Sequence, residues 1–200
     1  EYIVKILDTT IRDGSYAIGF KFSCKDVQNL VEKAEKIGIE YIEIGHGQGL
    51  NASSPEHGIA LQSDEEYMKA ARKVAGKAKL GFFCIPGIAR MEDLELAKKN
   101  GMDFIRIGVA CSDYKKAIPY VKKGCYEGLE VFVNFMKTYA SEPEEFAKAA
   151  AEVHNVGARC VYIVDSAGSM SSDEIGRYIE STRRMSNVCL LYTSDAADEL

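Results

Sequence analysis

Asp8, Arg12 and Asp13 place two carboxylates and a guanidinium within a short stretch of the chain. The preceding run Ile3-Val4-Lys5-Ile6-Leu7 predicts a short buried strand, so the polar cluster would lie at its carboxyl end, where parallel α/β proteins do their chemistry. A carboxylate there is a suitable ligand for a hard divalent cation, and an arginine can bind a carboxylate or a developing oxyanion. The spacing leaves open a structural ion pair between Arg12 and Asp8.

Polar residues follow other predicted strands as well. His46, in Gly45-His46-Gly47-Gln48-Gly49, could meet substrate or metal, or it could stabilise its loop by a hydrogen bond. Ser166 could offer its hydroxyl to a carboxylate, or it could begin a turn. Lys137, if desolvated, could form a Schiff base with a carbonyl substrate.

The elements that must position these residues recur along the chain. A helical segment, a glycine, two residues and an apolar strand form the repeat, and each glycine is placed to end a helix in the left-handed conformation. The repeat is centred on Gly38, Gly101 and Gly157, with a looser copy at Gly128. Ser-x-x-Glu spacings, typical of capping boxes, begin at Ser63, Ser141 and Ser171.

These signals predict six strands that alternate with helices. The strands are expected at 3–8, 41–45, 79–85, 104–110, 129–136 and 160–165, and the helices at 24–37, 64–77, 91–100, 113–126, 143–156 and 172–185. No glycine-rich phosphate loop follows the first strand, which makes a dinucleotide-binding sheet the weaker choice. The alternation favours a (β/α)8 TIM barrel, which normally takes about 250 residues. The 200 residues would hold about six units of an incomplete barrel.

Composition excludes several classes of function. The net charge of -5 and the lack of a Lys/Arg block argue against binding of nucleic acid. No apolar run approaches the roughly 20 residues that span a bilayer, and no signal segment is present, so we expect a cytoplasmic protein without membrane attachment. The six cysteines form no CxxC pair, which predicts reduced, mostly buried thiols.

Four blocks of sequence carry a resemblance to a known family. They are Leu7-Asp8-Thr9-Thr10-Ile11-Arg12-Asp13-Gly14-Ser15, Ile42-Glu43-Ile44-Gly45-His46-Gly47-Gln48-Gly49-Leu50, Ile85-Pro86-Gly87-Ile88 and Val164-Asp165-Ser166-Ala167-Gly168-Ser169-Met170. Together they resemble the 4-hydroxy-2-oxovalerate aldolases. These belong to the wider superfamily of metal-dependent TIM-barrel lyases and synthases with a pyruvate carboxyltransferase domain, which includes HMG-CoA lyase and isopropylmalate synthase.

The resemblance implies a lyase in which a divalent metal, Mn²⁺ or Mg²⁺, binds oxygens of a 2-oxo acid. Asp13 would match the metal-binding aspartate, Arg12 the arginine that stabilises the pyruvate enolate, and Ser166 the hydroxyl that holds the substrate carboxylate. We add His46 as a substrate-binding residue. The implied reaction cleaves a 4-hydroxy-2-oxo acid into pyruvate and an aldehyde, which an aldehyde dehydrogenase partner would take.

The chain departs from the family pattern at Tyr16, which stands where the aldolases have their acid/base histidine. We keep Tyr16 as a catalytic residue, although a phenol has an ordinary pKa near 10 and would act as a base near pH 7 only if that pKa were strongly shifted. A related condensation, acyl-transfer synthase, lyase or decarboxylation reaction on a 2-oxo acid therefore stays open.

The second departure lies at the carboxyl end of the chain. The family has a His-x-His pair of metal ligands on its seventh strand, but no histidine follows His154. Residues 188–200 change in character and look like translated sequencing-adapter DNA. We therefore predict a partial barrel domain at 1–187 and a non-native tail at 188–200, and we expect the full-length parent to be active and this chain alone to be inactive. The alternatives are a Schiff-base aldolase that uses Lys137 and a catalytically silent binding module.

Overall fold

The computed structural model describes residues 6–194, and the chain forms two compact units. Among the described residues, the first unit contains 6–105 and 127–129, and the second contains 106–126 and 130–194. Strand β4 (Phe104–Ala110) begins in the first unit and continues in the second. Residues 3–5 of the first predicted strand lie outside the described residues.

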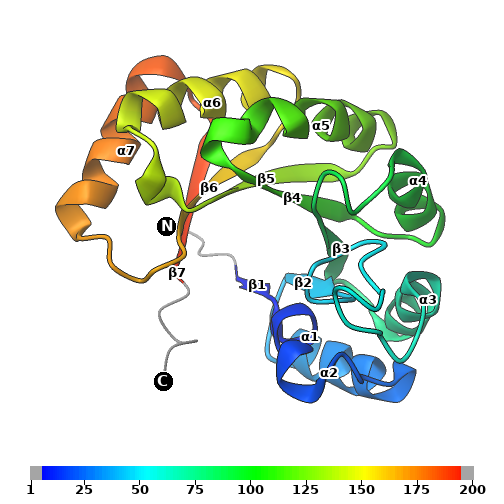
Figure 1. Cartoon of the computed structure of the whole chain (residues 1–200). Helices are drawn as coiled ribbons and strands as arrows, with labels where there is room; N and C mark the ends of the chain where they lie inside the picture. Colours follow the sequence, from blue (N-terminus) through cyan, green and yellow to red (C-terminus); the bar gives the residue numbers. More distant parts are fainter. Residues whose placement is uncertain (1–5, 195–200) are drawn as a thin grey trace. The chain divides into compact units, whose positions relative to one another are not determined.

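The first unit consists of short parallel strands with helices on one face (Figure 1). Its elements are β1 (Leu7–Asp8), α1 (Thr10–Asp13), the 3₁₀ helix η1 (Tyr16–Ile18), α2 (Cys24–Lys36), β2 (Tyr41–Ile44), α3 (Asp64–Val74), β3 (Lys79–Cys84) and α4 (Met91–Lys99). Strand β2 pairs with β1 through Leu7 opposite Tyr41, and with β3 through Tyr41 opposite Lys79. Helices α2 and α3 pack against each other.

The second unit repeats this arrangement. Its elements are η2 (Cys111–Lys116), α5 (Ala117–Tyr126), β5 (Glu130–Met136), η3 (Thr138–Ala140), α6 (Pro143–Asn155), β6 (Cys160–Asp165), α7 (Ser172–Met185) and β7 (Cys189–Ser194). Strand β6 pairs in parallel with β5 and with β7, and α6 packs against α7. The Phe146 ring on α6 lies edge-on to Phe135 of β5 and to Tyr178 of α7, with 5.5 Å between ring centroids in each pair.

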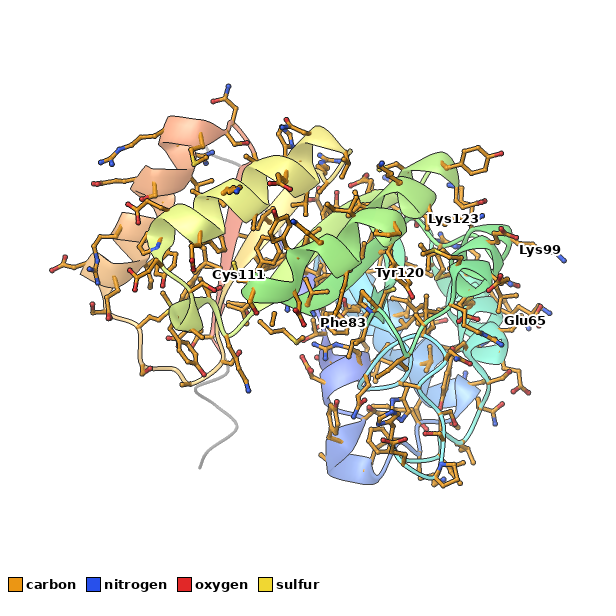
Figure 2. The ribbon with its side chains drawn as sticks, turned by 45° about the horizontal axis from the view of Figure 1, so that its top comes forward. Glu65, Phe83, Lys99, Cys111, Tyr120 and Lys123 are labelled. Carbon is orange, nitrogen blue, oxygen red and sulfur yellow. The ribbon has the colours of Figure 1, made fainter. Side chains whose placement is uncertain are left out.

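Apolar side chains fill the space between strands and helices in each unit. Val27, Val31 and Leu80 are fully buried in the first unit, as are Phe146 and Val153 in the second. On the first unit, the charged side chains of Glu65 on α3 and Lys99 on α4 point away from the core (Figure 2). No helix in the described part of the chain combines the length and apolar character needed to cross a membrane.

The structure confirms the parallel α/β class and the six predicted helices and strands, within a few residues at most ends, except that only Leu7–Asp8 of the strand predicted at 3–8 is observed as strand. It differs in two further places. The helix expected from residue 113 is a 3₁₀ segment up to Lys116, and regular α-helix begins only at Ala117. A seventh strand, β7, is present among the described residues, and it is formed by residues that we had assigned to the tail.

The helix starts confirm two of the three predicted capping boxes. The side chain of Ser63 accepts a hydrogen bond from the Glu66 backbone, and Ser171 does the same with Glu174. The box predicted at Ser141 is wrong, because Pro143 occupies the first helical position and makes Glu142 the N-cap. The glycines that end the four predicted helices all have positive φ angles, between 74° and 120°.

The six cysteines are free thiols, as predicted. Cys84, Cys111 and Cys160 are buried, whereas Cys125 and Cys189 are exposed. Three of the six are buried and Cys24 is partly buried, so the expectation that most of them would be buried is not met.

Candidate active site

Arg12 donates hydrogen bonds to partners from three parts of the first unit. Its Nε donates to Oε1 of Glu43 at 2.5 Å, Nη1 donates to the Gly47 carbonyl at 3.0 Å, and Nη2 donates to Oδ2 of Asp13 at 2.7 Å. The guanidinium carbon also lies 4.8 Å from the centroid of the Phe83 ring. The side chain of Glu43 is fully buried and that of Arg12 is 12% exposed. These contacts give the guanidinium a fixed orientation.

The chain around Arg12 is shaped by local hydrogen bonds. Asp8 accepts from the backbone N–H of Thr10 at 3.1 Å and from its hydroxyl at 2.9 Å, which steadies the start of α1. The Ser15 hydroxyl donates to the Arg12 carbonyl at 2.6 Å. Asp8 therefore serves the turn, and Arg12 pairs with Glu43 and Asp13 rather than forming the alternative ion pair with Asp8.

Tyr16 lies half-exposed beside this network. Partial burial raises the pKa of its phenol, and the nearby Arg12 cation lowers it by less. The phenol is therefore protonated at neutral pH, so Tyr16 can donate a hydrogen bond or a proton but is not a base there. Its ring covers Gly47, where a Cβ would come within 2.4 Å of a ring carbon.

His46 is buried and uses both ring nitrogens inside its own loop. Nε2 lies 3.0 Å from the Gly58 carbonyl oxygen, and Nδ1 accepts from the Gln48 backbone N–H at 3.1 Å. A carbonyl can only accept, so the ring proton is on Nε2. The imidazole also stacks on Phe20, with 4.1 Å between centroids. These contacts favour the loop-stabilising role that the sequence left open over contact with substrate or metal.

The second unit positions Ser166 and Lys137. The Ser166 hydroxyl oxygen accepts from the Lys137 backbone N–H at 3.1 Å, which leaves the hydroxyl proton for another acceptor. Asp165 is buried and accepts from the backbone N–H groups of Ser169 at 3.1 Å and Met170 at 2.9 Å. The Lys137 side chain is exposed, whereas a Schiff-base lysine requires a desolvated amine.

The structure thus brings Arg12, Asp13, Tyr16 and the His46 loop together in the first unit, and Lys137 and Ser166 together in the second. The site residues predicted from the sequence did not include Glu43, the buried carboxylate that holds Arg12. Its sequence signal is a charge inside the apolar strand Tyr-Ile-Glu-Ile, because a fully buried charge persists only when it is paired.

A metal centre cannot be assembled from the described residues alone. The Asp13 carboxylate is half-exposed, but its two oxygens lie 2.6 and 2.7 Å from the Arg12 guanidinium. Between residues 6 and 194, no three His, Cys, Asp or Glu side chains gather as a metal-binding group. Asp13 therefore offers one half-exposed carboxylate, and the described residues do not fit a complete metal site.

The fold and the site define a class: a parallel α/β protein with an arginine and carboxylates at the end of its first strand. A model of the HMGL-like family matches residues 3–191, so the chain belongs to this family. The resemblance found in the sequence is confirmed.

Two relatives illustrate the match. The chain is 40% identical over 183 residues to an oxaloacetate decarboxylase of Mycobacterium tuberculosis, covering 92% of this chain and 54% of that protein. It is 34% identical over 185 residues to a 4-hydroxy-2-oxovalerate aldolase of Geobacillus genomosp. 3, covering 92% of this chain and 55% of that protein. The chain spans about half the length of the curated relatives it matches.

Solved structures share the fold at lower identity. The carboxyl transferase domain of pyruvate carboxylase from Rhizobium etli superposes with a TM-score of 0.75 at 14% identity, over 94% of this chain and 35% of that one. Hydroxymethylglutaryl-CoA lyase from Pseudomonas aeruginosa superposes with a TM-score of 0.70 at 16% identity, over 91% of this chain and 64% of that one.

Proposed function

We propose that the complete protein to which this chain belongs is a carbon–carbon lyase that cleaves a 4-hydroxy-2-oxo acid into pyruvate and an aldehyde. The observation that carries this proposal is the Arg12 guanidinium, fixed by Glu43 and Gly47 at the end of β1. Breaking the C3–C4 bond of such an acid leaves the enolate of pyruvate, and a preorganised cation stabilises that developing charge. The relatives' names support the substrate class, since 4-hydroxy-2-oxovalerate and oxaloacetate are both 2-oxo acids.

Within this proposal, Arg12 stabilises the enolate, Tyr16 donates a hydrogen bond or proton, and Ser166 binds the substrate carboxylate. The support for Ser166 is its place in a matched sequence block and the hydroxyl proton that the contact with Lys137 leaves available. Ser166→Ala should raise KM for the 2-oxo acid more than it lowers kcat, because a contact to an unreacting carboxylate contributes mainly to binding.

We also propose that the complete protein binds a divalent cation, Mn²⁺ or Mg²⁺, with Asp13 as one ligand. The support is the family resemblance and the exposure of this carboxylate, whose oxygens suit a hard cation. The other ligands would lie outside the described residues. Titration calorimetry with MnCl₂ should show binding that Asp13→Asn abolishes, and an unchanged affinity in this variant would remove Asp13 from the ligand set.

Two further proposals concern the complete barrel and the carboxyl-terminal segment. We propose a (β/α)8 barrel in the complete protein and a non-native segment at 188–200. Sequencing the source DNA beyond the codon for Asn187 tests both. A His-x-His within about ten residues, on an apolar strand, would supply two further metal ligands. A native frame without histidines there would remove that ligand set.

The cellular setting is also a proposal. The six free thiols support a reducing compartment, which we take to be the cytoplasm. An aldehyde dehydrogenase is the partner that the aldehyde product would require, and co-purification of such an enzyme with the complete protein would test it.

Decarboxylation of an oxaloacetate-like acid is the second candidate, and Tyr16 favours it. Retro-aldol cleavage needs a base that takes the proton of the C4 hydroxyl, whereas decarboxylation needs no such base. The raised pKa of Tyr16 leaves a proton donor at this position, which suits delivery of a proton to the enolate.

The two reactions are separated by a direct assay of pyruvate release. The complete protein with added Mn²⁺ would receive 4-hydroxy-2-oxovalerate and oxaloacetate in parallel, with Tyr16→His as the matched variant. Aldolase function predicts pyruvate from the hydroxy acid and an increase in Tyr16→His. Release from oxaloacetate alone would select the decarboxylase, and release from neither would reject both.

Two rival mechanisms have their own tests. A Schiff-base aldolase would give a borohydride-trapped pyruvate adduct that is lost in Lys137→Ala and would be insensitive to EDTA. A catalytically silent module would show no exchange of the pyruvate methyl protons above buffer. Exchange without a trapped adduct would reject both rivals.

A further inference from the structure

The glycine-rich loop after β2 is closed by one imidazole. His46 contacts Gly58 through Nε2 and Gln48 through Nδ1, and the backbone N–H of Gly49 donates to the His46 carbonyl at 2.7 Å. The ring has 1% exposure and its face is covered by Phe20. His46 is therefore the side chain that holds both sides of this loop.

Gly47 lies inside this closed loop and touches the proposed catalytic arginine. It stands between His46 and Gln48, the two residues joined by the Nδ1 hydrogen bond. Its carbonyl accepts from Nη1 of Arg12 at 3.0 Å, and the Tyr16 ring leaves no room for a side chain at this position. The orientation of the Gly47 carbonyl thus depends on the imidazole on one side and sets a contact of Arg12 on the other.

We propose that His46 is a positioning residue, whose neutral imidazole with its proton on Nε2 holds the Gly47 carbonyl in place to orient the Arg12 guanidinium. The inference rests on the proposed function of Arg12, but it does not depend on which 2-oxo acid is cleaved. It also gives His46 no contact with substrate, although the sequence had predicted a substrate-binding role for this residue.

The protonation state of His46 follows from the same geometry. A protonated imidazole carries N–H groups on both nitrogens, so Nδ1 could no longer accept from Gln48. Burial lowers the pKa of His46, and the neighbouring His57 acts in the same direction through its charge. The neutral ring is thus retained at neutral pH, and acidification to the lowered pKa would open the loop.

The test compares variants that keep one or the other of the two side-chain hydrogen bonds of His46, which together we call the clamp: Nε2 with the Gly58 carbonyl and Nδ1 with the Gln48 N–H. In His46→Asn the side-chain oxygen can still accept from the N–H two residues on, as in an Asx turn, and the bond to Gly58 is lost. His46→Gln can reach Gly58 and loses the bond to Gln48. His57→Asn is the control, because no hydrogen bond from the His57 side chain to His46 is present among the described residues and the substitution keeps the His57 backbone.

We expect kcat of His46→Asn to stay within about threefold of the wild type, and kcat of His46→Gln to fall by more than about tenfold with little change in KM, because misplacing a catalytic group lowers the rate. His57→Asn should match the wild type. The acid limb of the wild-type kcat profile should disappear in His46→Asn, which has no titrating ring.

Two NMR measurements decide the proposal even without turnover. A long-range ¹H–¹⁵N correlation spectrum should show the Nε2–H tautomer of His46. Solvent exchange of the Arg12 Nη1 protons, which donate to the Gly47 carbonyl, should be slow in the wild type and His46→Asn, and faster in His46→Gln. An inactive wild type with these signals would contradict the proposed function and leave the positioning role supported.

Four outcomes would overturn the positioning role. One is an Nδ1–H tautomer. Another is equal Arg12 exchange in all variants. The third is a rise in KM in both His46 variants with kcat unchanged, which would make His46 a substrate-binding residue. Losses of kcat that follow losses of Tm in the same proportion would also reduce His46 to a purely structural residue.

Discussion

The two units use polar side chains at their strand ends in different ways. In the first unit, charged side chains hold one another, with Arg12 between Glu43, Asp13 and the Gly47 carbonyl. In the second unit, side chains hold the backbone. Thr138 donates to the Phe135 carbonyl and accepts from the Val164 N–H, while Asp165 accepts from two backbone N–H groups.

The difference indicates separate tasks for the two strand ends. A side-chain network around a cation orients one reactive group, because each contact ends on the guanidinium. Hydrogen bonds to the backbone instead shape the turns after β5 and β6, and in this way they place the Ser166 hydroxyl. The first arrangement should be sensitive to loss of charge, and the second to loss of single hydrogen bonds.

The largest expected effect is from Arg12→Met, which leaves the buried Glu43 carboxylate without this cation. We expect the free energy of unfolding to fall by about 3 kcal/mol, the scale for breaking a buried ion pair, and lyase activity to be lost. Urea denaturation measures the stability change. The matched control is Lys69→Met, which removes an exposed, solvent-screened ion pair with Glu65 and should cost far less. Equal costs in the two variants would contradict the comparison.

Thr138→Val should cost about 2 kcal/mol, because it keeps the shape of a buried side chain and leaves the buried Val164 N–H without its acceptor. Thr182→Val is the control in the same unit, since the Thr182 hydroxyl only donates to the Tyr178 carbonyl within α7. We expect less than about 1 kcal/mol there. A smaller loss in Thr138→Val than in Thr182→Val would show that the turn after β5 does not depend on this hydroxyl.

Asn134→Leu should stabilise the second unit by about 1 kcal/mol. Asn134 is 6% exposed, and its Oδ1 has no hydrogen-bond partner among residues 6–194. Removing an unsatisfied buried amide avoids its desolvation cost. Thermal unfolding and the lyase assay should be run together. A gain in Tm with a loss of activity would show that the amide is kept for a ligand, whereas a loss of Tm would mean that Asn134 is satisfied in the folded protein.

The smallest expected effect is on the pH dependence of stability. It concerns Glu35, whose role in the first unit differs from that of the charged side chains around Arg12. Away from its strand end, this unit also uses a side chain to hold backbone, since Glu35 accepts from the N–H groups of Gly76, Lys77 and Ala78. These bonds lower the pKa of Glu35, so its contribution is present above the unfolded pKa of about 4.3 and is lost as pH falls through the folded pKa. Urea midpoints should therefore fall less in Glu35→Gln than in the wild type between about pH 6 and pH 3. Parallel curves would contradict the assignment.

The sequence predicted most of the fold because its signals are local. Helix-ending glycines, serine caps and apolar runs act within a few residues, and they identified the six strands and six helices. The errors were local too. Pro143 moved a cap by one residue, and β7 was missed because its segment lacks the preceding glycine register and was set aside as a tail.

Local sequence signals predicted the positions of the candidate site residues but not their roles. The sequence by itself determined that Arg12, Asp13, Tyr16, His46 and Ser166 follow predicted strands, and it carried the family resemblance. Only the tertiary structure decided what these groups do there. It buried Glu43 against Arg12, occupied both nitrogens of His46 and left Tyr16 protonated. Such properties depend on burial and on partners more than ten residues away, as with Glu43 for Arg12 and Gly58 for His46, and no local spacing encodes them.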